Sequence, residues 1–264
     1  MENTLKEAEQ DYIQRWSVNS RQHFDDGDYE WICDLITKYF SIKPCHRIFE
    51  IGCGAGYSTL VFAIRDYRVV SIDDNEEAIK STKKLLNEND YEVSVVDSNN
   101  ETVGDIDVLL WKADLIHNLS DVIKVVNENE NCFIDMIVLC NPGGQLSNEI
   151  TKQEYKYLLW GNFTEDEILS AYTQGNIALL HKWALIFSAC VFSQLTDKPL
   201  LIVERGNKNE IGECLTQIQK DTGSRKICEA YRKIRNAPNG GIRLTSLDNN
   251  DDEQYWGAGL YYPI

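Results

Sequence analysis

Three glycines at alternate positions, Gly52, Gly54 and Gly56, form the stretch of this sequence best suited to holding a ligand. They lie between a short apolar run, residues 47–51, and an amphipathic run, residues 57–65. Glycine has no Cβ, so it lets the backbone turn tightly and lets a ligand approach closely. A strand that ends in such a turn and leads into a helix also presents free backbone N–H groups. The pattern is typical of nucleotide-binding turns.

The elements around this turn are expected to alternate between strands and helices. Apolar runs predict strands over residues 47–51, 68–72, 91–97, 107–111, 133–140 and 199–204. Helices are predicted over residues 5–40 (with a turn at 25–28), 57–65, 76–89, 119–128, from a capping box at 164–167 to about 195, and over 210–220. The tail to Ile264 is expected to contain two or three β segments. The alternation predicts an α/β fold, with a mostly parallel sheet, helices on both faces and a ligand at the carboxyl ends of the strands.

The spacing of the glycines distinguishes between two kinds of nucleotide-binding turn. A dinucleotide fingerprint is Gly-x-Gly-x-x-Gly, whereas here the third glycine follows one residue earlier and an acid precedes the turn by two positions. The pattern from Glu50 to Gly56 resembles the first motif of the class I S-adenosylmethionine-dependent methyltransferases. This resemblance implies a Rossmann-like fold with antiparallel strands at the C-terminal end, and S-adenosylmethionine as cofactor. It also implies that the cofactor is bound by Glu50, Gly52, Cys53, Gly54 and Gly56.

A second stretch, residues 69–75, resembles the second strand of the same family, in the right order and at the right distance. In that family the acid at the end of the strand holds the ribose hydroxyls. A carboxylate suits this task because it can accept hydrogen bonds from both hydroxyls. The resemblance therefore implies that Asp73, with Asp74 beside it, contacts the cofactor. Taken alone, Asp73 is also a reasonable N-cap for the helix that follows.

The third matching stretch, residues 112–115, resembles the loop that contacts the adenine ring. It implies that Asp114 accepts a hydrogen bond from the exocyclic amine and that Leu115 lies beside the ring. Residues 91–107 are longer than the fold needs, so a hairpin insertion and an alternative third strand over 91–97 both remain open. In the second case Asp97 takes the adenine role, but the sequence around Asp114 fits the motif better.

The fourth stretch, residues 133–142, resembles the fourth strand and the start of the substrate loop. This implies that Asn141 lies at the cofactor and positions the methyl acceptor. Asn141-Pro142-Gly143 half resembles the Asn-Pro-Pro-aromatic signature of enzymes that methylate amino groups of nucleobases or glutamine. The second proline and the aromatic are missing, and this argues against a flipped base or a planar amide as acceptor.

Residues 145–176 are expected to form a helical insertion after the fourth core strand. The segment contains five aromatic residues: Tyr155, Tyr157, Trp160, Phe163 and Tyr172. An aromatic insertion beside a cofactor suits a lid or an acceptor pocket, and the alternative is a helix pair that packs on the sheet. Four residues of the leading helices can close the opposite side: Trp16, His23, Phe24 and Tyr29.

The charge of the chain argues against a nucleic-acid partner. Asp and Glu number 42 against 26 Lys and Arg, which gives a net charge of −16. Nucleic-acid binders usually carry a basic face, because neutralising phosphates supplies much of their affinity. A local basic group at Lys226, Arg232, Lys233 and Arg235 is expected to be a solvated face of a strand or helix.

Cysteine usage and the polar N-terminus predict a cytoplasmic protein. The eight cysteines have no CxxC spacing, and several lie in apolar runs, as free thiols do in a reducing compartment. The four histidines have no metal-ligand spacing, so no metal is expected. Residues 177–192 are too short for a membrane span and contain His181 and Lys182, so a buried helix and no membrane contact are predicted.

The resemblance and the composition together predict one methyltransferase-like domain over residues 1–264. Its expected parts are N-terminal helices (1–40), a cofactor-binding half (45–144), an insertion or lid (145–176) and the C-terminal half of the sheet (177–264). The predicted function is methyl transfer from S-adenosylmethionine to a small molecule or a peptide. The alternatives are a non-catalytic or regulatory S-adenosylmethionine-binding protein of this fold, a nucleic-acid amino-methyltransferase, and an NAD-dependent oxidoreductase.

Overall fold

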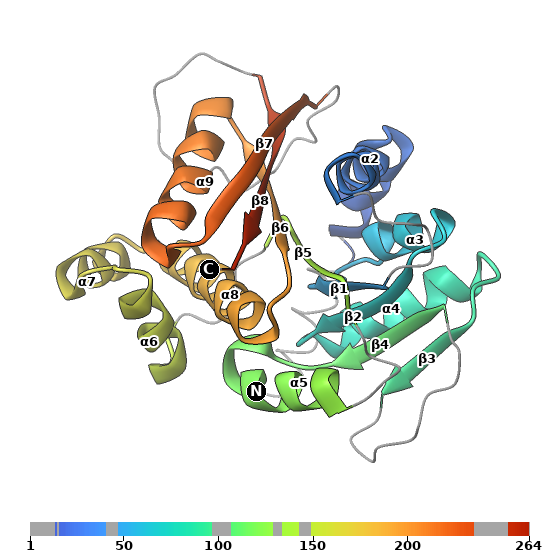
Figure 1. Cartoon of the computed structure of the whole chain (residues 1–264), viewed down its shortest axis with the longest axis horizontal. Helices are drawn as coiled ribbons and strands as arrows, with labels where there is room; N and C mark the ends of the chain where they lie inside the picture. The colour runs from blue at the N-terminus through green and yellow to red at the C-terminus, as the bar shows by residue number, and fades with distance from the viewer. Residues whose placement is uncertain are drawn as a thin grey trace. The chain divides into compact units, whose positions relative to one another are not determined.

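The structure is a computed structural model that describes residue 14 and residues 16–40, 47–96, 107–128, 134–142, 149–234 and 253–263 (Figure 1). It divides into two compact units. The first contains residues 1–114 and 124–138, and the second contains residues 115–123 and 139–264.

The sheet of the first unit is parallel and is built around β1 (Arg47–Ile51) and β2 (Arg68–Asp73). β4 (Val108–Lys112) pairs with the other side of β2, and β3 (Val93–Val96) lies at the edge beyond β4. Residues of β1, β2 and β4 are mostly buried, as expected for strands covered on both faces. The carboxyl ends of β1, β2 and β4 therefore share one edge.

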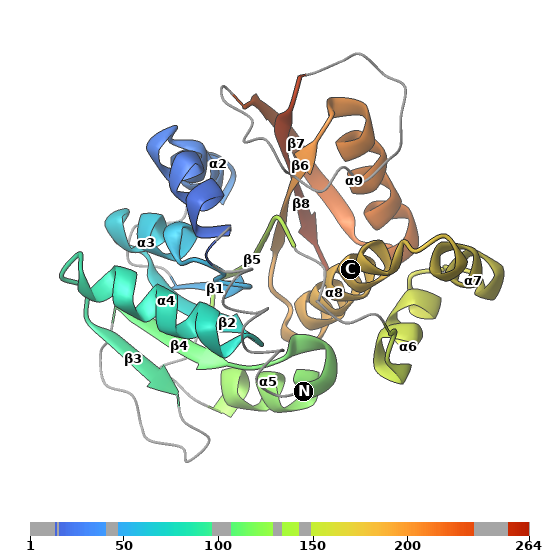
Figure 2. The same ribbon diagram turned by 180° about the vertical axis from the view of Figure 1, so that it is seen from behind.

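Helices of the first unit pack on this sheet and on one another. A helical segment over residues 16–25 turns at Gly27 (φ 70°) into α2 (Asp28–Phe40), where the sequence predicts the turn. α3 (Tyr57–Ile64) follows β1 and α4 (Glu76–Asn87) follows β2. Both pack against the sheet, and Figure 2 shows them on one of its faces.

The second unit contains the antiparallel strands. β6 (Leu200–Gly206) pairs with β8 (Tyr255–Tyr262), which in turn pairs with β7 (Arg225–Lys233). α9 (Lys208–Thr222) packs closely on β8, because a Cβ on Gly257 would lie 2.3 Å from Ile211 Cγ2. The glycine in β8 thus lets the helix approach the strand.

A helical group packs within the second unit around α8 (Ile177–Thr196). α6 (Lys152–Trp160) and α7 (Glu165–Thr173) both contact α8 (Figure 1). α8 is long and apolar enough to cross a membrane by length and composition, but 61% of its most apolar window is buried within the protein. This burial favours a core helix, as the sequence predicts.

The predicted fold class is confirmed: the sheet is mostly parallel, with antiparallel C-terminal strands. Several predicted boundaries differ from the structure. The helix predicted from residue 164 to about residue 195 is two helices, α7 and α8, which are separated by a turn at Gly175 (φ 75°). α5 (Leu115–Glu128) begins four residues before the predicted helix, and Asn118 inside it has non-helical angles (φ −116°, ψ 23°) that explain why the periodicity is clear only after it. β5 (Met136–Cys140) begins later than predicted: Asp135 is a bend, and its side-chain Oδ2 accepts from Arg47 N at 3.1 Å, in place of a backbone carbonyl.

Candidate functional site

The glycine turn follows β1 and has the backbone conformation that its sequence predicts. Gly52, Gly54 and Gly56 have φ of 83°, 51° and 87°, in the region that favours glycine. Gly52 N donates to Ile72 O at 2.7 Å, so the turn is anchored on the end of β2. Gly56 N donates to Cys53 O at 2.8 Å and closes the turn before α3.

The three glycines face different surroundings. A Cβ on Gly52 would meet no atom within 4 Å, so this side of the turn is open. A Cβ on Gly54 would lie 3.0 Å from the indole Nε1 of Trp16. A Cβ on Gly56 would lie 2.8 Å from Thr82 Cα, so Gly56 lets α3 approach α4 closely. The open face at Gly52 is where a ligand can approach the backbone, whereas Gly56 has a packing role.

Glu50 supports the turn from inside the protein. It is fully buried and accepts hydrogen bonds from the hydroxyls of Ser58 and Thr59 at 2.5 Å and of Ser71 at 2.8 Å. Burial raises the pKa of Glu50, and the three donors reduce that rise. These bonds tie β1 to α3 and β2. The predicted contact between Glu50 and the cofactor stays a prediction.

Cys53 is buried beneath the turn rather than displayed on it, with 3% of its surface exposed. Burial, and then the charge of Asp73, raise the pKa of its thiol well above the ordinary value. The thiol is therefore protonated and a poor nucleophile. Only the backbone of Cys53 suits the predicted role in ligand binding.

Asp73 connects the end of β2 to the glycine turn. Its Oδ2 accepts from Gly54 N and its Oδ1 accepts from Asn75 N, both at 2.9 Å. Burial, followed by the charge of Asp74, raises the pKa of Asp73 to about 7. Each carboxylate oxygen can accept more than one hydrogen bond, so Asp73 retains capacity for ribose hydroxyls.

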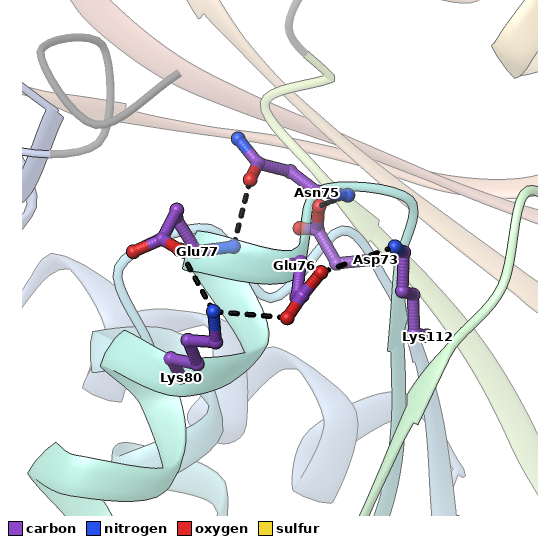
Figure 3. A network of polar contacts seen from close by, with 6 residues as sticks. All are labelled: Asp73, Asn75, Glu76, Glu77, Lys80 and Lys112. Atoms are coloured by element: carbon purple, nitrogen blue, oxygen red, sulfur yellow. Dashed lines mark hydrogen bonds and ion pairs between the residues drawn. The ribbon is translucent and has the colours of Figure 1, made fainter. Parts of the chain in front are cut away.

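The start of α4 is fixed by a polar network beside Asp73 (Figure 3). The side chain of Asn75 caps the helix by accepting from Glu77 N at 2.9 Å. Lys80 pairs with Glu76 at 2.9 Å, and Lys112, at the end of β4, reaches Glu76 at 3.5 Å. Asn75, rather than Asp73, is therefore the N-cap.

Asp114 follows the strand that lies beside β2. In the register of the sheet Asp73 is paired with Lys112, and Ala113 N donates to Asp73 O at 3.0 Å. The neighbour of β2 is thus β4 and not the strand that precedes Asp97, which favours Asp114 for the adenine contact. Asp97 itself lies outside the described residues. Leu115 is 3% exposed and begins α5 in the second unit.

Asn141 follows β5 and belongs to the second unit. Its φ is 47°, a conformation that asparagine tolerates better than most residues, and its N–H donates to Val203 O at 2.7 Å. The backbone of Asn141 is thus fixed on β6. Its place beside the cofactor stays a prediction.

The aromatic residues of α6 and of the segment after it pack into a core around α8. The Trp160 ring lies 6.1 Å from Phe187, and the Phe163 ring lies 6.0 Å from Phe187 and 5.8 Å from Trp183. Tyr157 is 6% exposed in the same cluster. These contacts favour the packed helix pair over an acceptor pocket, although the predicted partner was the sheet rather than α8. A lid stays a prediction.

Two buried pairs of polar side chains in the second unit are not predicted from the sequence. His181 donates from Nδ1 to Glu154, whose other oxygen accepts from Thr151 N at 2.7 Å in a capping box. Lys182 pairs with Glu204 at 2.5 Å. The sequence does contain a sign of these pairs, because a histidine and a lysine lie in an otherwise apolar helix. Their acidic partners could not be identified, since they lie 27 and 22 residues away in the sequence.

Neither metal nor disulfide chemistry is supported by the part of the chain that the structure describes. No group of three or more His, Cys, Asp or Glu side chains there could hold a metal ion. Six cysteines are free thiols: Cys33, Cys53, Cys140, Cys190, Cys214 and Cys228.

Comparisons with known proteins agree with the motifs. The family model described as protein-L-isoaspartate(D-aspartate) O-methyltransferase matches residues 30–107, which include the glycine turn and Asp73. No curated protein sequence gives a significant match. The structure of the "delta-N METTL16 MTase domain" is similar in fold, at 12% identity over 89% of this chain and 82% of that chain, with a TM-score of 0.50.

Two other solved structures are more distant. A proposed RNA methyltransferase, PH1948 from Pyrococcus horikoshii, is 10% identical over 90% of this chain and 83% of its own, with a TM-score of 0.48. Magnesium protoporphyrin IX methyltransferase from Synechocystis PCC 6803, with bound S-adenosylmethionine, is 11% identical over 96% and 84%, with a TM-score of 0.44.

The family match and the fold confirm the predicted resemblance to class I, Rossmann-like methyltransferases. They support an S-adenosylmethionine-dependent methyltransferase, with S-adenosylmethionine as its cofactor. The matched residues contain the turn whose open face and neighbouring carboxylate suit that cofactor.

Proposed function

We propose that this methyltransferase transfers the methyl group of S-adenosylmethionine to a small molecule or a peptide. The observation that carries the cofactor part of this proposal is the bond between Gly54 N and Asp73 Oδ2. It places a carboxylate directly beside an open glycine turn at the carboxyl ends of β1 and β2. Ligands of open α/β sheets bind at this edge.

In this proposal, different residues of the first unit contact different parts of the cofactor. Gly52 offers an open backbone face for the methionine part, and Asp73 accepts from the ribose hydroxyls. Asp114, beyond the end of β4, accepts from the adenine amine. Glu50 and Gly56 hold the turn in shape, since both are bonded or packed within the protein.

Methyl transfer from S-adenosylmethionine needs few catalytic groups from the protein. S-adenosylmethionine supplies an activated methyl group on a sulfonium, and the protein holds the acceptor in line and excludes water. We assign acceptor positioning to Asn141, whose side-chain carbonyl can accept from an N–H or O–H. A base is needed only where the acceptor must first lose a proton.

The charge distribution supports a small-molecule or peptide acceptor. The chain carries a net charge of −16, which opposes binding to a polyanion. Two lysines of the basic group on β7 are paired with acids: Lys226 with Glu229, and Lys233 with Glu253. The matched family is described as acting on isoaspartate or D-aspartate in protein, which supports a peptide. Arg235 lies outside the described residues.

Labelled methyl transfer tests the acceptor class. Purified protein is incubated with S-adenosylmethionine carrying a tritiated methyl group and, separately, with a peptide digest, a small-molecule extract and total RNA. We expect label in the peptides or the small molecules, and much less label when Asp73→Asn is used at a concentration of S-adenosylmethionine below the Kd of that variant. Label in RNA alone would overturn the proposed acceptor and restore the nucleic-acid alternative.

The cytoplasmic location stays a prediction.

A further inference from the structure

Trp16 lies against the glycine turn. Its indole Nε1 and Cδ1 are 3.0 Å and 3.2 Å from the point where a Cβ on Gly54 would be. The ring thus covers the side of Gly54 that a side chain would occupy in any other residue. Two positions earlier, Gly52 faces open space. The indole and this open face therefore border the same turn.

The helical segment that carries Trp16 is fixed to the rest of the first unit. His23 Nδ1 lies 2.8 Å from Asp28 Oδ2, and both side chains are almost completely buried. The ring of Phe24 lies 5.6 Å from the ring of Tyr57, the first residue of α3. These contacts hold the end of the segment near residues 23–24, and Trp16 lies two helical turns before them. Its position over Gly54 is thus supported by a packed helix.

The environment of Trp16 differs from that of a core aromatic. Core residues of α2 such as Tyr29 and Ile32 are 4% and 0% exposed, whereas Trp16 is only half-buried. Part of the residue therefore remains exposed to solvent. A tryptophan offers a large, rigid apolar surface and an N–H donor, so few side chains are better suited to cover a ligand.

We propose that Trp16 is a cofactor-binding residue, whose indole forms a wall over S-adenosylmethionine held on the glycine turn. The inference rests on the proposed function, because that function places the cofactor at Gly52 and Gly54. By packing on the bound cofactor, the indole shields it from water and slows its dissociation. Gly54 is a glycine in part because the indole occupies the space of its Cβ.

Titration with S-adenosylhomocysteine tests this role without an acceptor. Trp16→Ala should raise the Kd about tenfold or more, mainly through faster dissociation. Trp16→Phe keeps an aromatic wall and should stay within about threefold of the wild type. Trp160→Ala, in the second unit, is the matched control and should leave the Kd unchanged. Melting temperatures without ligand separate lost binding from lost stability.

Tryptophan fluorescence gives a second readout that does not depend on the alanine variant folding. S-adenosylhomocysteine should change the emission of the wild type, and most of that change should be absent in Trp16→Phe but present in Trp160→Phe. A change of full size in Trp16→Phe would overturn the inference.

A double-mutant cycle between Gly54 and Trp16 tests whether the two residues are in contact. Gly54→Ala places a methyl group 3.0 Å from the indole, so it should weaken binding less when Trp16 is already alanine. Equal Kd values for Trp16→Ala and the wild type, or tighter binding by the variant, would overturn the inference alone. Failure of the wild type to bind S-adenosylhomocysteine would overturn the proposed function and this inference with it.

Discussion

From the sequence, both the glycine turn of the first unit and the aromatic helices of the second unit are candidates for ligand contact. In the structure, the turn has an open face, whereas the aromatic side chains pack against one another. At the turn, Gly54 and Asp73 lie in hydrogen-bond contact beside an open backbone face. In the second unit, Trp160 and Phe163 pack on Phe187. Glycine spacing constrains the backbone directly, whereas aromatic content does not distinguish a pocket from a core.

The comparison predicts that the aromatic helices contribute stability and the turn contributes binding. Phe187 is fully buried at the centre of the aromatic cluster. Phe187→Ala should lower the free energy of unfolding by about 3–5 kcal/mol, because it removes a large side chain and leaves a cavity. Denaturant melts measure this loss. The Kd of the folded variant for S-adenosylhomocysteine should not change, and a tenfold rise would place the cluster at the cofactor.

Alanine substitutions at Gly52 and Gly56 should separate the packing role of the turn from its open face. Gly56→Ala brings a Cβ 2.8 Å from Thr82 Cα at φ 87°, so overpacking and backbone strain should together cost about 3 kcal/mol of stability. Gly52→Ala meets no atom and should cost only the strain, about 1–2 kcal/mol. Thermal melts of the two variants without ligand compare these costs. Equal losses would show that Gly56 has no packing role.

Removing the charge of Asp73 should weaken binding more than it weakens the fold. Asp73→Asn removes a charged hydrogen-bond acceptor, worth about 1.5–3 kcal/mol, and should raise the Kd for S-adenosylhomocysteine by roughly tenfold to a hundredfold. Glu92→Gln, an exposed acid before β3, serves as control. Isothermal titration calorimetry measures both. An unchanged Kd for Asp73→Asn would remove Asp73 from the ribose site.

The raised pKa of Asp73 predicts a smaller, pH-dependent effect. Ribose hydroxyls donate to the ionised carboxylate, so binding lowers the pKa from about 7 and releases a proton. Affinity should therefore rise by roughly tenfold between pH 6 and pH 8 and level off above pH 8. Asp73→Asn should lose this dependence. Calorimetry between pH 6 and 8 checks it, and stronger binding at pH 6 would contradict it.

The same pKa has the opposite consequence for the fold without ligand. Because the folded pKa lies above the unfolded value of 3.8, the native state holds the proton more tightly. The cost of ionising Asp73 is therefore present above pH 7 and is relieved as the pH falls through about 7 toward 3.8. Bound cofactor should offset part of that cost.

Much of the first unit could be predicted from the sequence, because its signals are local. The three glycines have the positive φ that their spacing suggests, and the apolar runs that end at Ile51 and Ile72 form the strands β1 and β2. Between the two candidate third strands, the motif favours the one before Asp114, but periodicity alone does not distinguish them. The choice depends on which strand pairs with β2, and the register shows that this is β4.

The second unit was predicted less fully, because its important contacts are distant in sequence. Glu154 pairs with His181, and Glu204 pairs with Lys182. The members of each pair lie on different elements, and the periodicity of the sequence does not predict which elements pack together. Burial raises the pKa of Glu204, and its Oε1 has no hydrogen-bond partner among the described residues. The predicted capping box at Thr164 is confirmed, since it depends on only four residues.

The most direct test of S-adenosylmethionine binding at the glycine turn is a titration of the wild type and of Gly54→Val with S-adenosylhomocysteine and with NAD. Valine at Gly54 fills the space of the turn, opposes its φ of 51° and meets the indole of Trp16. We expect one-to-one binding of S-adenosylhomocysteine to the wild type, no binding of NAD, and loss of binding in a Gly54→Val protein that retains its circular dichroism spectrum. Wild-type affinity in Gly54→Val, or binding of NAD in place of S-adenosylhomocysteine, would contradict this expectation.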